Sequence, residues 1–137
     1  MDGRRLAVAW PLFAAAAIIF QSGHVVAEDV RLDPMEIGKQ QFQTSCGTCH
    51  TAEEGAGNRQ GPNLHSVYGR KVGTAPDYHY SDALKSGDWV WTEATLDPWL
   101  TNSQKAHPGT FMNYRQANAD KRQTVIAYLK SLSKKVE

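Results

Sequence analysis

Two cysteines and a histidine lie within one pentapeptide, Cys46-Gly47-Thr48-Cys49-His50. This spacing suits covalent attachment of a haem, because two thiols about one helical turn apart can add to the two vinyl groups on one side of the porphyrin. The residue directly after the second cysteine then lies under the iron, where an imidazole can coordinate it. The motif therefore predicts one haem c, held by Cys46 and Cys49, with its iron ligated by His50.

The cysteine pair has three other interpretations. A disulfide between Cys46 and Cys49 would close so short a loop that it would restrain the unfolded chain little. A thioredoxin-like redox pair needs a preceding strand and a βαβ pattern, which the sequence lacks. A structural zinc site needs further ligands, and the chain has no second pair of cysteines. Haem attachment is the interpretation that uses all three side chains of the motif.

Whether the second axial position of the iron is occupied distinguishes an electron carrier from a haem protein that binds small molecules or substrates. A methionine or a second histidine closes the site, whereas an open position admits oxygen, nitric oxide or a substrate. After the haem motif the candidates are His65, His79, His107 and Met112. Met112 closely follows Pro108-Gly109-Thr110, in which proline and glycine indicate a fixed turn rather than a helix face. We therefore expect Met112 to be the second ligand.

Residues 1–27 have the layout of a secretory signal peptide. Arg4 and Arg5 precede an apolar run of 15 residues, and Val25-Val26-Ala27 offers a small residue for cleavage. An uncleaved anchor is the alternative, although a spanning helix needs roughly 20 apolar residues. Cleavage after Ala27 would leave residues 28–137 as one domain with a formal charge of zero, exported to the periplasm. The absence of a basic stripe argues against nucleic acid binding.

The strongest helix signals lie near the two ends of this domain. Asp33-Pro34-Met35-Glu36 places an N-cap aspartate before a first-turn proline and a glutamate, which predicts a helix to about residue 44 that buries Ile37 and Phe42. A last helix is expected over residues 120–132, with Val125, Ile126, Leu129 and Leu132 on one apolar face.

Between these ends, long glycine-rich loops are expected over residues 51–77 and 106–116. A short helix should occupy residues 81–86. Another should lie between residues 92 and 101, with a break near Asp97, because Pro98 suits a first helical turn better than an interior. Loops this long are unusual in so small a domain unless they wrap a ligand. The sequence thus predicts an all-α domain of several helices and long loops around one haem.

The chain resembles class I cytochrome c, of the mitochondrial and bacterial periplasmic soluble type, over about residues 38–129. The matching features occur in the family's order: Gly38 and Phe42, CGTCH, Gly61-Pro-Asn-Leu-His65, Gly69-Arg-Lys71, Thr74-Ala-Pro76, Tyr80-Ser-Asp-Ala83, Trp91, Pro108-Gly-Thr-Phe-Met112 and Ile126-Ala-Tyr-Leu-Lys130. The resemblance implies a small cytochrome c fold and a single-haem electron carrier rather than an enzyme.

The resemblance also implies a role for each matching residue. His50 and Met112 would be the axial ligands of the iron. The carbonyl of Pro62 would accept a hydrogen bond from the His50 ring and fix its orientation. Gly38 and Phe42 would meet Val125 and Tyr128 where the first and last helices cross. Four further residues would bond or neutralise the haem propionates: Arg70, Tyr80, Trp91 and Thr110.

Two pocket positions depart from the family. Trp99 stands where a tyrosine usually lies beside the axial methionine, and Leu84 stands where an asparagine usually lies near the propionates. Both replacements should weaken the polar network behind the haem.

The expected docking surface departs as well. Family members often carry a ring of lysines around the exposed haem edge, which steers them to acidic partners. Here Arg59, Lys71 and Lys105 remain, but Gln104 and Phe111 stand where lysine is common. We expect a weak salt dependence of docking, with Phe111 supplying an apolar contact.

The function that we expect is transfer of one electron at a time between redox partners by a monomer. The family implies that these partners are quinol–cytochrome c reductase, a terminal oxidase, or a periplasmic dehydrogenase or reductase. Two alternatives remain. A haem enzyme or gas-binding protein would need a labile sixth ligand, and His107 near Met112 is instead expected on the surface. A haem subunit held at the membrane would retain residues 1–27.

Overall fold

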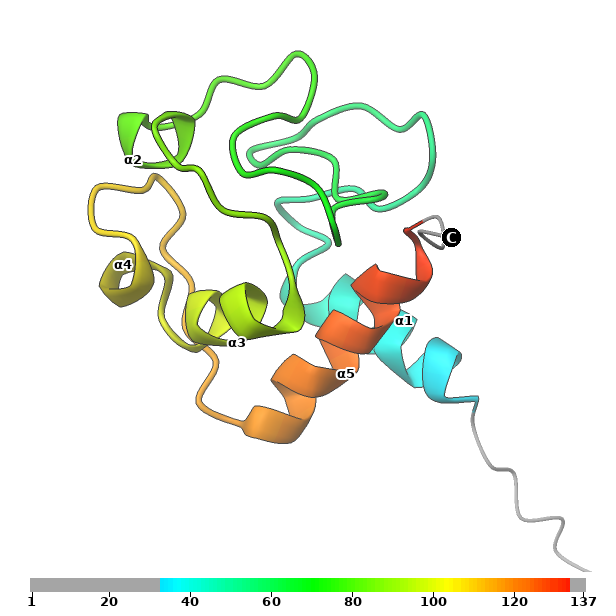
Figure 1. Cartoon of the computed structure of the whole chain (residues 1–137). Coiled ribbons are helices and arrows are strands. Elements are labelled where there is room, and N and C mark those ends of the chain that lie inside the picture. The colour runs from blue at the N-terminus through cyan, green and yellow to red at the C-terminus, as the bar shows by residue number, and fades with distance from the viewer. Residues whose placement is uncertain (1–32, 134–137) are drawn as a thin grey trace, which may run out of the picture. The chain divides into compact units, whose positions relative to one another are not determined.

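The computed structural model describes residues 33–133, so the predicted signal peptide lies outside the described part of the chain. Five helices form within this range (Figure 1): α1 (Pro34–Ser45), α2 (Asp82–Lys85), α3 (Glu93–Thr101), α4 (Ser103–Ala106) and α5 (Ala119–Ser131). The described residues contain no strand beyond a single bridge between Lys71 and Val90. The predicted all-α fold is confirmed. None of the helices within residues 33–133 is long and apolar enough to span a membrane.

Helices α1 and α5 lie against each other (Figure 1), as the resemblance to the family implies. Asp33 caps α1 by accepting a hydrogen bond from the backbone N–H of Met35 at 2.8 Å. Gly38 permits close approach, because a β-carbon there would lie 2.8 Å from Cβ of Tyr128. The ring of Phe42 contacts that of Tyr128, with centroids 5.5 Å apart. Ile37 is 42% exposed, so its expected burial is wrong: Gly38 and Phe42 share the inner face of α1, and Ile37 points about 100° away from Gly38.

Helix α3 runs unbroken from Glu93 to Thr101, so the expected break near Asp97 is wrong. Thr92 caps the helix, and its backbone N–H donates to Oγ1 of Thr95 at 2.8 Å. Pro98 removes only the hydrogen bond to the carbonyl of Ala94, which lies on an exposed residue. Burial of three apolar side chains offsets that loss: Leu96, Trp99 and Leu100.

The remaining helices are single turns within long loops. Helix α2 matches the short helix expected over residues 81–86. Helix α4 was not expected. Asn102 caps it, and the Asn102 side chain accepts a hydrogen bond from the backbone N–H of Lys105 at 3.0 Å. After α4, residues 107–118 form the expected loop around Met112. Together these segments surround the interior that carries the candidate site.

Candidate functional site

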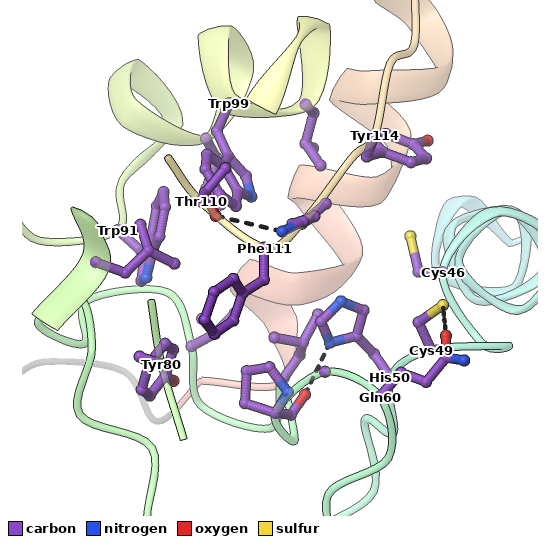
Figure 2. A pocket seen from close by; sticks show the side chains of 18 of the residues that line it. Cys46, Cys49, His50, Gln60, Tyr80, Trp91, Trp99, Thr110, Phe111 and Tyr114 are labelled. Atoms are coloured by element: carbon purple, nitrogen blue, oxygen red, sulfur yellow. Dashed lines mark hydrogen bonds between the residues drawn. The ribbon is translucent and has the colours of Figure 1, made fainter. Parts of the chain in front are cut away.

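A largely apolar cavity of about 360 Å³ opens between the loops and helices α3 and α5. Its volume falls within the range of small-molecule and cofactor sites, about 300–1,000 Å³. All nine site residues predicted from the sequence line it: Cys46, Cys49, His50, Pro62, Arg70, Tyr80, Trp91, Thr110 and Met112. Figure 2 shows Cys46 and Cys49 on one side of this cavity and Tyr80 and Trp91 on the other. The fold thus brings residues that are far apart in the sequence to one place.

The haem motif itself forms a helical turn at the end of α1. The backbone N–H groups of Cys49 and His50 both donate to the carbonyl of Cys46, at 3.0 and 2.9 Å. This turn directs both thiols toward the cavity, and both are free in the structure. The thiol of Cys49 donates to Oε1 of Gln60 at 3.1 Å. Burial, together with the nearby Cys49, raises the pKa of the Cys46 thiol to about 11.

The His50 ring is fixed by the loop that follows the motif. Its Nδ1 lies 2.8 Å from the carbonyl oxygen of Pro62 (Figure 2), and because that oxygen can only accept, Nδ1 carries the proton. Burial lowers the pKa of His50, which the hydrogen bond to Pro62 opposes only in part. The neutral ring therefore has a lone pair on Nε2, the form of imidazole that coordinates iron.

Gly61 packs against the same ring more closely than any other residue type could. A β-carbon at position 61 would lie 2.2 Å from Cε1 of His50 and 2.7 Å from Nε2. The backbone N–H of Gly61 donates to the carbonyl of Cys49 at 2.8 Å, so the loop cannot move away without losing this bond. The sequence offers glycine and proline at 61 and 62, but the contact with His50 becomes visible only in the folded chain.

The far end of the cavity is polar and contains a half-buried cation. Arg70 donates to the carbonyls of Asn63 and His65 at 3.1 and 3.2 Å. Burial lowers the pKa of this guanidinium, which the nearby Tyr80 partly opposes. The ion pairs formed within residues 33–133 join Lys85 to Asp82 and Arg122 to Asp97, and none involves Arg70. A half-buried cation beside a cavity without a carboxylate suits a ligand that carries its own negative charge.

Two other members of this polar end make local hydrogen bonds. The hydroxyl of Tyr80 accepts a bond from the backbone N–H of Ala75 at 3.2 Å and retains its own proton for donation. Thr110 is buried, and its Oγ1 lies 3.4 Å from the backbone nitrogen of Met112. These hydroxyls could therefore share the binding of carboxylates with Arg70.

Of the four candidates for the second iron ligand, Met112 lines the cavity and the three histidines do not. His79 stacks on Phe111, with ring centroids 6.4 Å apart. His107 stacks almost parallel on Trp89 at 3.9 Å and is partly buried, so its expected surface position holds only in part. The methionine is thus the candidate that shares a cavity with His50.

Both pocket departures predicted from the sequence lie in the cavity wall. Leu84 and Trp99 line it and are buried. Sequence reasoning missed Tyr78, which also lines the cavity and donates from its hydroxyl to the carbonyl of Gln60 at 2.7 Å. Its spacing of two residues from Tyr80 was the available signal, and the two rings meet edge to face at 4.8 Å.

A helical fold around an apolar cavity, with two thiols on one side and an oriented neutral imidazole, defines a protein that binds haem c covalently. Residues 35–133 match the family Cytochrome c. The chain belongs to the cytochrome c family.

Individual relatives agree with this assignment. A cytochrome c from Sesamum indicum is 45% identical over 94 residues, which cover 68% of this chain and 85% of that relative. A cytochrome c from Ginkgo biloba is 41% identical over 99 residues, covering 72% of this chain and 87% of the relative. One from Euglena viridis is 43% identical over 98 residues, covering 71% and 95%. Proteins of this family carry electrons rather than catalyse reactions, and they act with reductase and oxidase partners.

The expected periplasmic location is wrong. These relatives are eukaryotic cytochromes c, which sit in the mitochondrial intermembrane space. The expectation rested on basic residues followed by an apolar run in residues 1–27. Hydrophobicity and flanking positive charge indicate a targeting segment, but they do not by themselves specify the compartment to which the protein is sent.

Proposed function

We propose that this haem electron carrier transfers one electron at a time through an iron ligated by His50 and Met112. The observation that carries the proposal is the shared cavity: His50 presents an oriented, neutral imidazole, and Met112 lines the same space from a separate loop. A thioether as the second ligand closes the iron to small molecules and raises the reduction potential. Both properties suit a carrier that exchanges electrons with protein partners.

The protein's own contribution is to hold and shield the cofactor. When bound, haem c supplies the one-electron exchange between ferrous and ferric iron. Cys46 and Cys49 would hold it covalently, and Pro62 would keep the His50 ring in orientation. Leu84, Trp99 and their apolar neighbours would exclude water from the cavity. Four polar residues would bind the propionates: Arg70, Tyr80, Trp91 and Thr110.

Replacing Met112 with alanine should open the sixth position of the iron. Oxidised wild-type protein is expected to show the weak red absorption band of thioether ligation and to bind cyanide slowly. Met112→Ala should lose the band, become high-spin and bind cyanide at once, while His50 and the covalent bonds remain. Met35→Ala is the matched control, because this methionine lies exposed on α1. Persistence of the red band in Met112→Ala would exclude Met112 as the ligand.

Cleavage after Ala27 also belongs to this proposal, with residues 28–137 as the mature electron carrier. The apolar run of 15 residues and the small residues before Glu28 support it. The mass of the purified haem protein tests the boundary. A mass that includes residues 1–27 would instead favour a carrier held at a membrane.

We further propose that docking to redox partners relies on an apolar contact at Phe111. This side chain is 66% exposed, yet it borders the cavity and stacks on His79, so its position at the pocket edge is defined. Gln104, where the family often has lysine, is occupied by hydrogen bonds to the backbone. Long-range steering by charge is therefore weaker here than in a lysine-rich relative.

Phe111→Lys should make electron transfer depend more strongly on salt. With a cytochrome c reductase or oxidase, we expect the wild-type rate to fall about threefold or less between about 10 mM and 150 mM salt, as the Debye length shortens. Phe111→Lys should make the rate fall more steeply with salt. At high salt its rate should be below that of wild type, because the apolar contact of Phe111 is lost. Val90→Lys adds the same charge at an exposed position outside the cavity and should change little. A steep fall with the wild-type protein would contradict the proposal.

A further inference from the structure

The loop that carries Met112 is held by hydrogen bonds from the single turn of helix α4. The hydroxyl of Ser103 donates to the carbonyl of Met112 at 2.8 Å. The side-chain amide of Gln104 donates to the same carbonyl at 2.9 Å and to that of Thr110 at 2.8 Å. Two consecutive residues of α4 therefore bind the backbone on both sides of Phe111.

Ser103 is the inner member of this pair and is 0% exposed. Its Oγ accepts a bond from the backbone N–H of Tyr114 at 2.9 Å, and its own N–H donates to the carbonyl of Tyr114 at 3.1 Å. The hydroxyl thus bridges the residues on either side of Asn113. Because Ser103 is fully buried, separating the loop from α4 would leave its hydroxyl and its backbone N–H without partners, which costs more than losing an exposed hydrogen bond.

Helix α4 is itself fixed at both ends. Asn102 accepts a hydrogen bond from the backbone N–H of Lys105 at 3.0 Å. His107, directly after the helix, stacks on Trp89 at 3.9 Å and approaches the ring of Trp99 at 5.7 Å. Trp99 belongs to α3 and to the cavity wall. Because α4 is fixed in this way, the Met112 loop can open only if its hydrogen bonds to Ser103 and Gln104 break.

We propose that Ser103 and Gln104 are positioning residues that set how readily the sixth iron position opens. The inference rests on the proposed ligation by Met112 and deepens it, because it identifies what keeps that ligand in place. Loss of the hydrogen bonds that either side chain donates to the loop should speed opening of the loop about five- to tenfold. Ser103 and Gln104 act through the backbone of the loop and need not touch the haem.

The chemistry of Gln104 suits this role better than that of lysine, the residue common at this position in the family. An amide N–H group donates to two carbonyls, as observed here. Its nitrogen has no basic lone pair, so it cannot replace the methionine on the iron, whereas a deprotonated lysine amine could. Gln104 can hold the loop closed without offering a competing ligand.

Gln104→Glu tests the proposal with an almost isosteric change, because it replaces the donating amide by an accepting oxygen. In the oxidised haem protein we expect cyanide to bind about tenfold faster than in wild type, with the red band of thioether ligation retained at rest. Amide hydrogen exchange at Tyr114 should accelerate to a similar extent. Gln40→Glu is the matched control: it makes the same charge change on an exposed residue of α1 outside the cavity, and both rates should stay at wild-type values.

Ser103→Ala provides a second variant, with an expected fivefold increase in the cyanide rate. Wild-type rates of cyanide binding and Tyr114 exchange in folded Gln104→Glu would overturn the positioning role. Met112→Ala, measured in parallel, separates this failure from failure of the proposed function. If Met112→Ala opens the site and Gln104→Glu does not, the ligation stands and the positioning role falls. If Met112→Ala binds cyanide as slowly as wild type, both fall.

Discussion

Gly61→Ala is expected to abolish most covalent loading of haem. The new methyl group would lie 2.2 Å from Cε1 of His50, well inside van der Waals contact. Neither side can move without losing a hydrogen bond, because the His50 ring is hydrogen-bonded to the carbonyl of Pro62 and the N–H of Gly61 to the carbonyl of Cys49. The imidazole would be displaced from the orientation that iron ligation needs, and the adjacent thiols would lose their placement with it.

The measurement for this variant is the ratio of covalently bound haem to protein, from absorbance and mass. Gly57→Ala is the matched control, because a β-carbon there would meet nothing within 4 Å. It should load haem like wild type. Equal loading of Gly61→Ala and Gly57→Ala would show that the close approach to His50 has no consequence.

Arg70→Leu is expected to lower the free energy of unfolding of the haem protein by about 2–4 kcal/mol. The change orphans the carbonyls of Asn63 and His65, which accept bonds from the guanidinium in a half-buried setting. It also removes the cation that would face the haem propionates. The reduction potential should fall as well, because a nearby positive charge favours the ferrous state over the ferric state.

Denaturant unfolding and an equilibrium potential measure the two effects of Arg70→Leu. Arg115→Leu is the control, since Arg115 is exposed and lies outside the cavity. It should change stability by less than about 0.5 kcal/mol. A potential for Arg70→Leu equal to that of the control would contradict the proposed contact with the propionates.

The parts of the fold set by neighbours along the chain could be predicted. Asp33 and Pro34 mark the start of α1, and the haem motif is contiguous, so both were identified from local sequence. The prediction of which α1 residues are buried is half right: Phe42 is buried and Ile37 is exposed. Which face of a helix is buried depends on its partner, and here Gly38 brings α1 close to Tyr128 of α5.

The errors arise where distant residues decide the local structure. Packing of Trp99 and Leu100 keeps α3 continuous through Pro98, against the local preference for a break. Helix α4 has only four residues, too few to show a helical periodicity in the sequence. Its hydrogen bonds include those to Met112 and Tyr114, which lie outside the helix. His107 is held by stacking on Trp89, 18 positions away in the chain.

The candidate site shows the same division. A short contiguous motif predicted the thiols and His50, and the turn before Met112 predicted the second ligand. Resemblance to the family predicted the polar end of the cavity. The contact between Gly61 and His50 and the bonds from Gln104 to the Met112 loop come only from the folded chain. These contacts carry the strongest new predictions.

A redox titration of the purified wild-type protein, followed by its optical spectrum, tests the central claim most directly. A closed haem ligated by His50 and Met112 predicts a single one-electron transition at positive potential. It also predicts a low-spin oxidised form whose weak red band disappears on reduction. A negative midpoint potential, together with a high-spin oxidised spectrum that binds cyanide at once, would contradict the claim.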